Sequence, residues 1–225
     1  MSKEKEPFYR TEVLWGAKAI YERNLVDFGE GNVSVRNAKE EELFITPSFN
    51  NYETLIDDQI VHVNFDGTAM SKGKLPSTEV KMHIMIYQSR PKVHAIIHTH
   101  SPYATMLSVN QMSIPTIMEE QIVFLGGSID VSPFGEAHTE EIGQSALKAL
   151  GKKNAALLAN HGVIVCGKSI EHAVKFAELV EKLAKIYWGS LQIGKPNIIS
   201  ENHSVKFNKL FESLFASYSR IKRKK

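Results

Sequence analysis

Cysteine is nearly absent from this chain, since Cys166 is the only one among 225 residues. A single cysteine cannot form an internal disulfide, so the fold must be stabilised without one. The residues before it, Val163, Ile164 and Val165, are apolar and β-branched. This setting predicts a buried side chain that behaves as a small hydrophobic group, not as a reactive thiol.

Long hydrophobic runs are absent as well. No apolar stretch approaches the length that a membrane-spanning helix needs. The N-terminus, Met-Ser-Lys-Glu-Lys-Glu-Pro, lacks the apolar segment of a secretory signal. We therefore expect a soluble, cytoplasmic protein with no membrane partner.

The chain also lacks a strong charge of either sign, with 27 Lys and Arg against 25 Asp and Glu. The basic tail 222–225 is typical of a solvated chain end, so we do not expect a nucleic-acid partner. No linker-like stretch rich in Pro, Gly or Ser and no internal repeat interrupts the sequence. A hydrophobic content of 43% over this length predicts one domain over 1–225, with a helical tail from about residue 203.

Hydrophobic periodicity indicates an α/β fold. Helical spacing alternates with short strand-like segments, and several segments are bounded by capping or turn residues. The order predicts a mostly antiparallel sheet with helices on both faces. The predicted elements are a helix over 13–25, strands near 33–35, 43–46 and 60–65, a helix from about 78, a strand over 93–100, a helix from 102, a helix over 139–150, two strands flanking residue 161, a helix over 170–187 and a short helix over 210–218.

The segment Val-His-Ala-Ile-Ile-His-Thr-His carries the most informative pattern. His98 and His100 are two residues apart, and alternate side chains of a strand project to the same face. His161 lies in an Asn-His-Gly turn between two apolar runs, where a hairpin can bring it to the pair. Three neutral imidazoles leave a divalent ion with open positions, as in catalytic sites. The alternative is that these histidines are hydrogen-bonded core residues without a metal.

An acidic residue stands at a predicted helix start. Glu79 follows Pro76, Ser77 and Thr78, a sequence typical of helix N-termini. Together with His161, this carboxylate favours a metal site at the histidine pair. The alternative is a solvent-facing carboxylate of the first helical turn, favoured there by the helix dipole.

Several motifs together resemble the class II aldolase and adducin N-terminal family over about residues 10 to 195. They are Gly31-Asn32-Val33-Ser34, Ile45-Thr46-Pro47-Ser48, Pro76-Ser77-Thr78-Glu79, His98-Thr99-His100-Ser101 and Asn160-His161-Gly162. The resemblance implies a single-domain αβα sandwich around a mostly antiparallel sheet. It also implies a homotetramer with active sites between subunits.

The resemblance further implies a divalent metal, either Zn²⁺ or another ion such as Mn²⁺, Co²⁺ or Fe²⁺. Its ligands would be His98, His100 and His161, with Glu79 as a further ligand and as the acid/base residue. Within the family, the chain most resembles aldolases acting on L-fuculose 1-phosphate. The implied reaction is reversible cleavage of a ketose 1-phosphate to dihydroxyacetone phosphate and an aldehyde.

Other activities of the same superfamily stay open. They are dehydration of methylthioribulose 1-phosphate and 4-epimerisation of ribulose 5-phosphate, because fold and metal site do not separate these reactions. A non-enzymatic, adducin-like interaction module is a further alternative. That alternative is characterised by missing ligands, whereas this chain keeps all three histidines and Glu79.

The substrate phosphate is expected to bind to backbone amides and hydroxyls. Free amides and the dipole at a helix N-terminus attract anions, and small turn residues allow close approach. The alternative is that each of these is an ordinary turn or cap residue. The candidates are Gly31, Asn32, Ser48, Ser77 and Thr78.

Two departures from the family pattern bear on which substrate the protein binds. Phe49 stands where the family's phosphate loop usually has glycine, and it is expected to reshape the anion pocket because phenylalanine does not readily take a positive φ. The second departure is the absence of a family tyrosine near residues 114–120. Glu119 or Glu120 is the candidate second acid/base residue there, the alternative being two surface charges. Tyr218 resembles a C-terminal tyrosine that closes over the substrate.

Overall fold

The computed structural model describes residues 6–37, 39–49 and 51–200, together with 202, 204, 205, 207 and 209. Its centre is a six-stranded sheet in the order β3-β2-β1-β4-β6-β5. Every pair of neighbouring strands is antiparallel. The strands are β1 (Asn32–Asn37), β2 (Glu42–Ile45), β3 (Val61–Asn64), β4 (Ala95–Thr99), β5 (Ala155–Leu158) and β6 (Gly162–Gly167).

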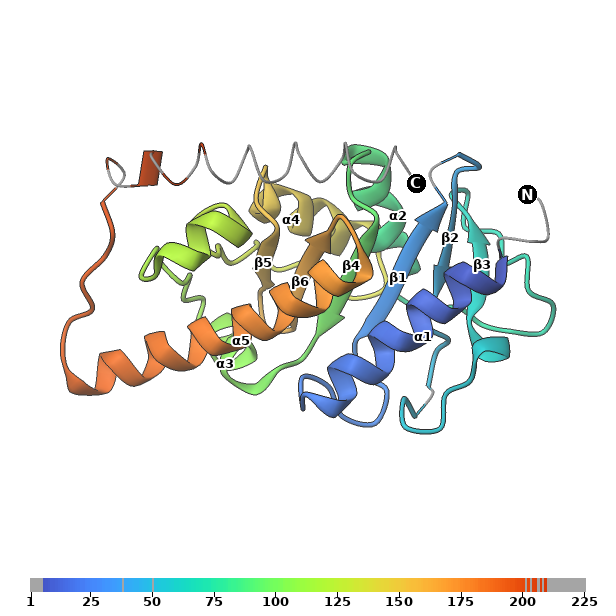
Figure 1. The fold of residues 1–225 in the computed structure, drawn as a ribbon, viewed down its shortest axis with the longest axis horizontal. Helices are drawn as coiled ribbons and strands as arrows, with labels where there is room; N and C mark the ends of the chain where they lie inside the picture. Colours follow the sequence, from blue (N-terminus) through green and yellow to red (C-terminus); the bar gives the residue numbers. More distant parts are fainter. Residues whose placement is uncertain are drawn as a thin grey trace.

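Helices cover both faces of the sheet, which confirms the predicted α/β class. Figure 1 shows α1 and α5 crossing one face, and these helices share a hydrophobic core with α3. On the other face, α2 and α4 enclose a second core. The helices are α1 (Glu6–Glu22), α2 (Val80–Ser89), α3 (Pro102–Val109), α4 (Glu140–Leu150) and α5 (Ile170–Ile193), with a 3₁₀ turn η1 (Asp57–Gln59) and a π-helical turn η2 (Gln121–Leu125).

Strand β4 shows how the two cores determine the orientation of the histidines. Ala95 and Ile97 belong to the core beneath α1 and α5, whereas Ile96 belongs to the core beneath α2 and α4. Because side chains alternate along a strand, His98 projects to the same side as Ile96. It therefore points toward the layer that contains α2.

Several predicted helix signals have the expected structural role. Pro102 is the first residue of α3, where its missing N–H costs no hydrogen bond. Thr139 caps α4 by accepting a hydrogen bond from the Glu141 N–H. Helix α5 begins at the predicted Ile170 and continues to Ile193, six residues beyond the expected end.

Three predicted boundaries are wrong by a few residues. Helix α1 stops at Glu22 and not near residue 25, because Asn24 adopts a φ of 54° and ends the helix. Helix α2 starts at Val80, so Glu79 is its N-cap residue. Strand β4 ends at Thr99, which places His100 one residue beyond it.

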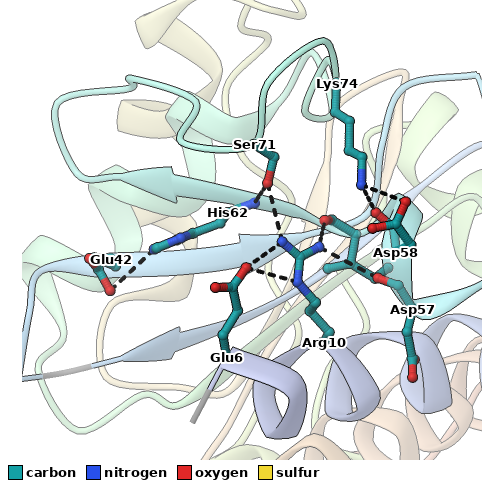
Figure 2. A network of polar contacts seen from close by, with 9 residues as sticks. Glu6, Arg10, Glu42, Asp57, Asp58, His62, Ser71 and Lys74 are labelled. Carbon is teal, nitrogen blue, oxygen red and sulfur yellow. Dashed lines mark hydrogen bonds and ion pairs between the residues drawn. The ribbon is translucent and has the colours of Figure 1, made fainter. Parts of the chain in front are cut away.

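A polar network at the β3 edge of the sheet links α1 to the segment that follows β3 (Figure 2). Arg10 of α1 pairs with Glu6 at 2.5 Å and donates to the backbone carbonyl of Ile60. Arg10 also donates to Ser71 Oγ at 3.3 Å, and that oxygen accepts a hydrogen bond from the His62 N–H at 3.0 Å. Helix α1 thereby anchors the connection that leads from β3 to α2.

Three further expectations concern Cys166, membrane-spanning helices and the C-terminal segment. Cys166 is buried as predicted, and burial raises the pKa of its thiol to about 11. The helices in the described part of the chain are all too short or too polar to traverse a bilayer. The predicted helix over 210–218, with Tyr218, lies outside the described residues.

Candidate metal centre

His98, His100 and His161 come together at one end of the sheet. One nitrogen from each ring lies within 4.8 Å of the other two. The ring centroids are 4.8 Å apart for His98 and His100, 4.7 Å for His98 and His161, and 5.0 Å for His100 and His161. The structure thus brings together the three imidazoles singled out from the sequence.

The hairpin of β5 and β6 delivers His161 to this cluster. Strand β6 pairs with β4 from Val163 to Gly167, so the turn before β6 lies beside the end of β4. Gly162 makes that approach possible, since a Cβ atom at this position would lie 2.3 Å from the Thr99 carbonyl oxygen. A larger residue at position 162 would push the turn away from the cluster.

Backbone hydrogen bonding orients the ring of His98. The side chain is fully buried, with an exposed fraction of 0%, and its Nδ1 lies 2.8 Å from the carbonyl oxygen of Val163. A carbonyl oxygen only accepts hydrogen bonds, so Nδ1 carries the proton. In the neutral ring the lone pair is then on Nε2, the atom 2.9 Å from His100 Nε2. His98 therefore presents a metal-binding nitrogen to the cluster.

Glu79 faces the histidines from the N-terminus of α2. Its Oε2 lies 3.2 Å from His98 Nε2, and its Oε1 lies 3.4 Å from His161 Nε2. Asn32, which pairs with His98 across β1 and β4, donates a hydrogen bond of 2.7 Å to Oε2. Only 6% of Glu79 is exposed, so the solvent-facing alternative does not hold.

The charges in the cluster favour a cation. Burial by itself raises the pKa of Glu79, but His98, His161 and the Asn32 hydrogen bond outweigh burial and lower it to about 2. Burial and the neighbouring imidazoles lower the pKa of His100 to about 3 and that of His161 to about 4. At neutral pH the ionised carboxylate of Glu79 therefore stands close to His100 and His161, two imidazoles that keep their lone pairs.

These residues fit a divalent ion. Imidazole nitrogens and a carboxylate oxygen are ligands that zinc and similar ions bind. Glu79 Oε1 is buried and accepts no hydrogen bond from any residue in the described part of the chain. Such an acceptor needs a partner, and a cation held by the three histidines would provide one.

The predicted phosphate-binding residues lie on three adjoining segments next to Glu79. Gly31 has a φ of 71° and packs so closely that a Cβ would lie 2.5 Å from the His98 carbonyl oxygen. Ser77 is buried, and its Oγ accepts a hydrogen bond of 3.3 Å from the Glu79 N–H. Ser48 Oγ donates to the Pro76 carbonyl at 2.7 Å, and Thr78 is exposed. Asn32, the remaining candidate, contacts Glu79 as described above.

Phe49 takes the backbone conformation that the family pattern reserves for glycine. Its φ is 57°, and 93% of the residue is exposed. Phenylalanine does not readily take a positive φ, yet it has one here, and the reshaping of the anion pocket stays a prediction. The loop keeps its left-handed turn, at the expense of backbone strain, and its ring projects into solvent beside Ser48.

The candidates for a second acid/base residue are away from the histidines. Glu120 Oε1 accepts a hydrogen bond of 2.9 Å from Lys182, and this contact lowers the pKa of Glu120. Glu119 is exposed. Neither carboxylate contacts the three histidines within the described chain, and Tyr218 lies outside it.

Glu30 also approaches the cluster, and it is not among the site residues predicted from the sequence. Its Oε2 lies 3.7 Å from His100 Nδ1. The signal available in the sequence is an acidic residue directly before the Gly31-Asn32 turn. Only the pairing of β1 with β4 shows that this turn lies against the histidines.

Comparison with known proteins places the chain in a family. The model of the class II aldolase and adducin N-terminal domain matches residues 11–188. The chain belongs to this family. This class II aldolase-like chain is 37% identical to L-fuculose phosphate aldolase of Escherichia coli over 166 residues, which is 74% of this chain and 76% of that protein.

Two more relatives extend the similarity over nearly the whole chain. The 5-deoxy-D-ribulose 1-phosphate aldolase of Bacillus thuringiensis is 30% identical over 203 residues, covering 90% of this chain and 95% of that protein. A solved structure of L-fuculose 1-phosphate aldolase has a TM-score of 0.87 at 29% identity and covers 94% of this chain and 98% of that one. The class II aldolase-like fold expected from the motifs is thereby confirmed.

Proposed function

We propose that this protein is a divalent-metal-dependent aldolase that reversibly cleaves a ketose 1-phosphate into dihydroxyacetone phosphate and a short aldehyde. The observation that carries the proposal is the cluster of His98, His100 and His161 with Glu79 at its edge. Two named relatives act on ketose 1-phosphates, L-fuculose phosphate and 5-deoxy-D-ribulose 1-phosphate.

The three histidines, with Glu79 beside them, would hold the ion, which we expect to be zinc or a similar divalent metal. When bound, the ion supplies the Lewis acid that stabilises negative charge on substrate oxygens next to the reacting carbon. The chain itself keeps the ligand nitrogens unprotonated, because burial lowers the pKa of His100 and of His161. The carbonyl of Val163 fixes the ring of His98.

Glu79 is the residue that we assign to proton transfer at C3. In the direction of synthesis, a base removes a proton from C3 of dihydroxyacetone phosphate, and that carbon forms a bond to the aldehyde carbon. The low pKa of Glu79 keeps its carboxylate ionised at neutral pH, which is the form that a base needs. In cleavage, the bond between C3 and C4 breaks, C3 receives the proton and the C4 hydroxyl loses one. Glu119, Glu120 and Tyr218 remain the candidates for the group at the C4 hydroxyl.

Substrate phosphate is assigned to the segments around Gly31, Ser48 and Ser77, with Asn32 and Thr78. Their closeness to Glu79 supports this assignment, since the Ser77 hydroxyl accepts from the Glu79 N–H. Backbone amides at the start of α2 add a site that attracts anions. We also propose a homotetramer with active sites between subunits, as the family resemblance implies, and a cytoplasmic location.

The test incubates metal-loaded protein with dihydroxyacetone phosphate and either acetaldehyde or lactaldehyde. These aldehydes would be released from 5-deoxyribulose 1-phosphate and from L-fuculose 1-phosphate by cleavage between C3 and C4. We expect carbon–carbon bond formation with at least one of them. Consumption of methylthioribulose 1-phosphate alone, with loss of water, would show a dehydratase instead, and interconversion of ribulose 5-phosphate alone would show an epimerase.

A pair of histidine variants makes the test specific for the cluster. His100→Gln should lose the bound metal and the activity together. His94→Gln is the matched control, because His94 precedes β4, lies outside the cluster and pairs with Glu12 at 3.1 Å. A protein that binds no stoichiometric metal and shows none of these reactions would favour the interaction-module alternative.

A further inference from the structure

Glu30 faces the side of the His100 ring that points away from the other histidines. His100 Nε2 lies 2.9 Å from His98 Nε2, inside the cluster. The second ring nitrogen, Nδ1, lies 3.7 Å from Glu30 Oε2. At this distance the contact is electrostatic and not a direct hydrogen bond. A negative charge thus stands beside the outer nitrogen of one expected metal ligand.

The carboxylate of Glu30 is held in place by its own turn. Its Oε1 accepts a hydrogen bond of 3.2 Å from the Asp27 N–H, and its backbone N–H donates to the Asp27 carbonyl at 2.9 Å. Gly31, the next residue, packs directly against the His98 carbonyl oxygen. The turn is therefore fixed against the end of β4, and Oε2 is directed at His100.

We propose that Glu30 is a positioning residue for the metal centre and acts through His100. A carboxylate beside Nδ1 favours the tautomer with the proton on Nδ1, which leaves the lone pair on Nε2 facing the cluster. It also makes that nitrogen a stronger donor to a cation, as outer carboxylates do for histidine ligands. This inference rests on the proposed metal-dependent function.

The Nδ1 atoms of His98 and His100 then face different groups. His98 donates to a neutral backbone carbonyl, that of Val163, which no side-chain substitution removes. His100 faces the charged side chain of Glu30. Substitution of Glu30 therefore changes one ligand and leaves the other intact.

The experiment compares zinc affinity of the full chain and its E30Q variant by competition with a chromophoric chelator. Glutamine keeps an oxygen for the Asp27 N–H and presents its NH₂ group to His100, which favours the wrong tautomer. We expect zinc to bind about 10-fold to 100-fold more weakly. The melting temperature of the metal-free protein should not change, and the visible spectrum of the Co²⁺-loaded variant should shift.

Asp27→Asn is the matched control, because it removes one negative charge from the same turn through an exposed side chain. It should keep the zinc affinity of the unsubstituted protein. Equal losses in both variants would reveal a general charge effect and overturn the proposal. The same holds if E30Q lowers the melting temperature of the metal-free protein and leaves the Co²⁺ spectrum unchanged, as a purely structural role would.

The two proposals fail in different ways. If the unsubstituted protein binds zinc and E30Q binds it equally tightly, the role of Glu30 is wrong and the proposed function stands. If the unsubstituted protein itself binds neither Zn²⁺ nor Co²⁺, the proposed function is wrong, and the role of Glu30 falls with it.

Discussion

Glu79 is ionised at a position where burial opposes ionisation. A buried carboxylate normally has a raised pKa because it loses its hydration. Here His98, His161 and the amide of Asn32 reverse that effect and lower the pKa to about 2. A carboxylate whose pKa is strongly shifted by neighbouring residues is typical of sites that transfer protons. Glutamine has the same shape as glutamate but no charge, so it tests the role of the Glu79 carboxylate.

Glu79→Gln is expected to reduce aldol turnover by about 100-fold to 10,000-fold, the usual contribution of a positioned acid/base group. Glutamine retains an oxygen that can accept the hydrogen bond from Asn32. Steady-state kinetics with dihydroxyacetone phosphate and an aldehyde measure the loss, and circular dichroism checks the fold. The control is Glu53→Gln, which removes an exposed carboxylate. A kcat within a few-fold of the unsubstituted value would remove Glu79 from the mechanism.

Phe49 combines an unfavourable backbone conformation with almost no burial. A left-handed φ costs a residue with a Cβ about 1 to 2 kcal/mol, and glycine escapes that cost. The exposed ring gains little from packing in return. The strain is therefore located in the backbone at Phe49 and not in contacts of its side chain.

Two substitutions separate the ring from the backbone. Phe49→Ala removes the ring and keeps the Cβ, so the free energy of unfolding should hardly change. Phe49→Gly should be more stable than Phe49→Ala by about 1 kcal/mol, because only glycine relieves the positive φ. Urea unfolding of both variants gives this difference. Equal stability of the two would show that the turn is not strained.

At the scale of single elements, the sequence predicts the strands and helices whose residues have a regular local spacing. The strand-like spacing of His98 and His100 predicts that the two meet, which they do although His100 lies one residue beyond β4. The apolar runs around His161 predict the hairpin that carries it. Helix α2 follows the Pro76–Glu79 segment as expected. These features depend on contacts between residues close in sequence.

What the sequence could not predict depends on pairing between distant segments. Glu30 and His100 are separated by most of the first half of the chain, and the antiparallel register of β1 with β4 brings them together. The hydrogen bond from Asn32 to Glu79 arises in the same way. Local spacing does not encode such a register, which is determined by packing of the whole sheet.

Gly162 allows β6 to begin beside the histidines. A Cβ there would lie 2.3 Å from the Thr99 carbonyl and 2.9 Å from His100 Cδ2. Gly162→Ala should cost about 1 to 3 kcal/mol of stability, as overpacking does, and should weaken zinc binding because the turn with His161 is displaced. Urea unfolding and chelator competition measure the two effects.

Gly189→Ala is the matched control for this substitution. Gly189 lies within α5, and a Cβ there would meet nothing within 4 Å. Alanine should stabilise the helix by about 0.5 to 1 kcal/mol and leave zinc binding unchanged. If Gly162→Ala behaved like this control, the close approach of β6 to β4 would not position the cluster.

At the scale of the whole molecule, the candidate site lies where the sheet meets the layer of α2. Two hydrophobic cores hold the sheet rigid from both sides. The histidines lie at the ends of central strands, and Glu79 stands at the N-cap position of the helix packed on the same face. This layer also buries His83 of α2, which has an exposed fraction of 0%. Its Nδ1 lies 2.7 Å from Ser34 Oγ.

His83 links the global stability of the protein to pH. Burial lowers its pKa from 6.5 to about 3, so between these values the unfolded chain binds a proton that the folded chain does not. Stability is therefore lost as the pH falls below about 6.5, with a slope of about 1.4 kcal/mol per pH unit for this group. The lowered pKa values of His100 and His161 act in the same direction. Glu79 adds to the loss only as the pH falls from 4.5 toward about 2.

Urea unfolding of the metal-free protein between about pH 7 and pH 5 measures this dependence. We expect the free energy of unfolding to fall steadily with pH below 6.5. His83→Gln should be less stable at neutral pH. The slope of its unfolding free energy against pH should be smaller by about 1.4 kcal/mol per pH unit, because glutamine takes up no proton. His138→Gln replaces an exposed histidine that contributes least among the causes lowering the pKa of His161, so it should keep most of the slope. If His83→Gln left the slope unchanged, the acid sensitivity would be assigned to the cluster of His98, His100 and His161 instead. The loss of Zn²⁺ with falling pH would then follow the protonation of these histidines.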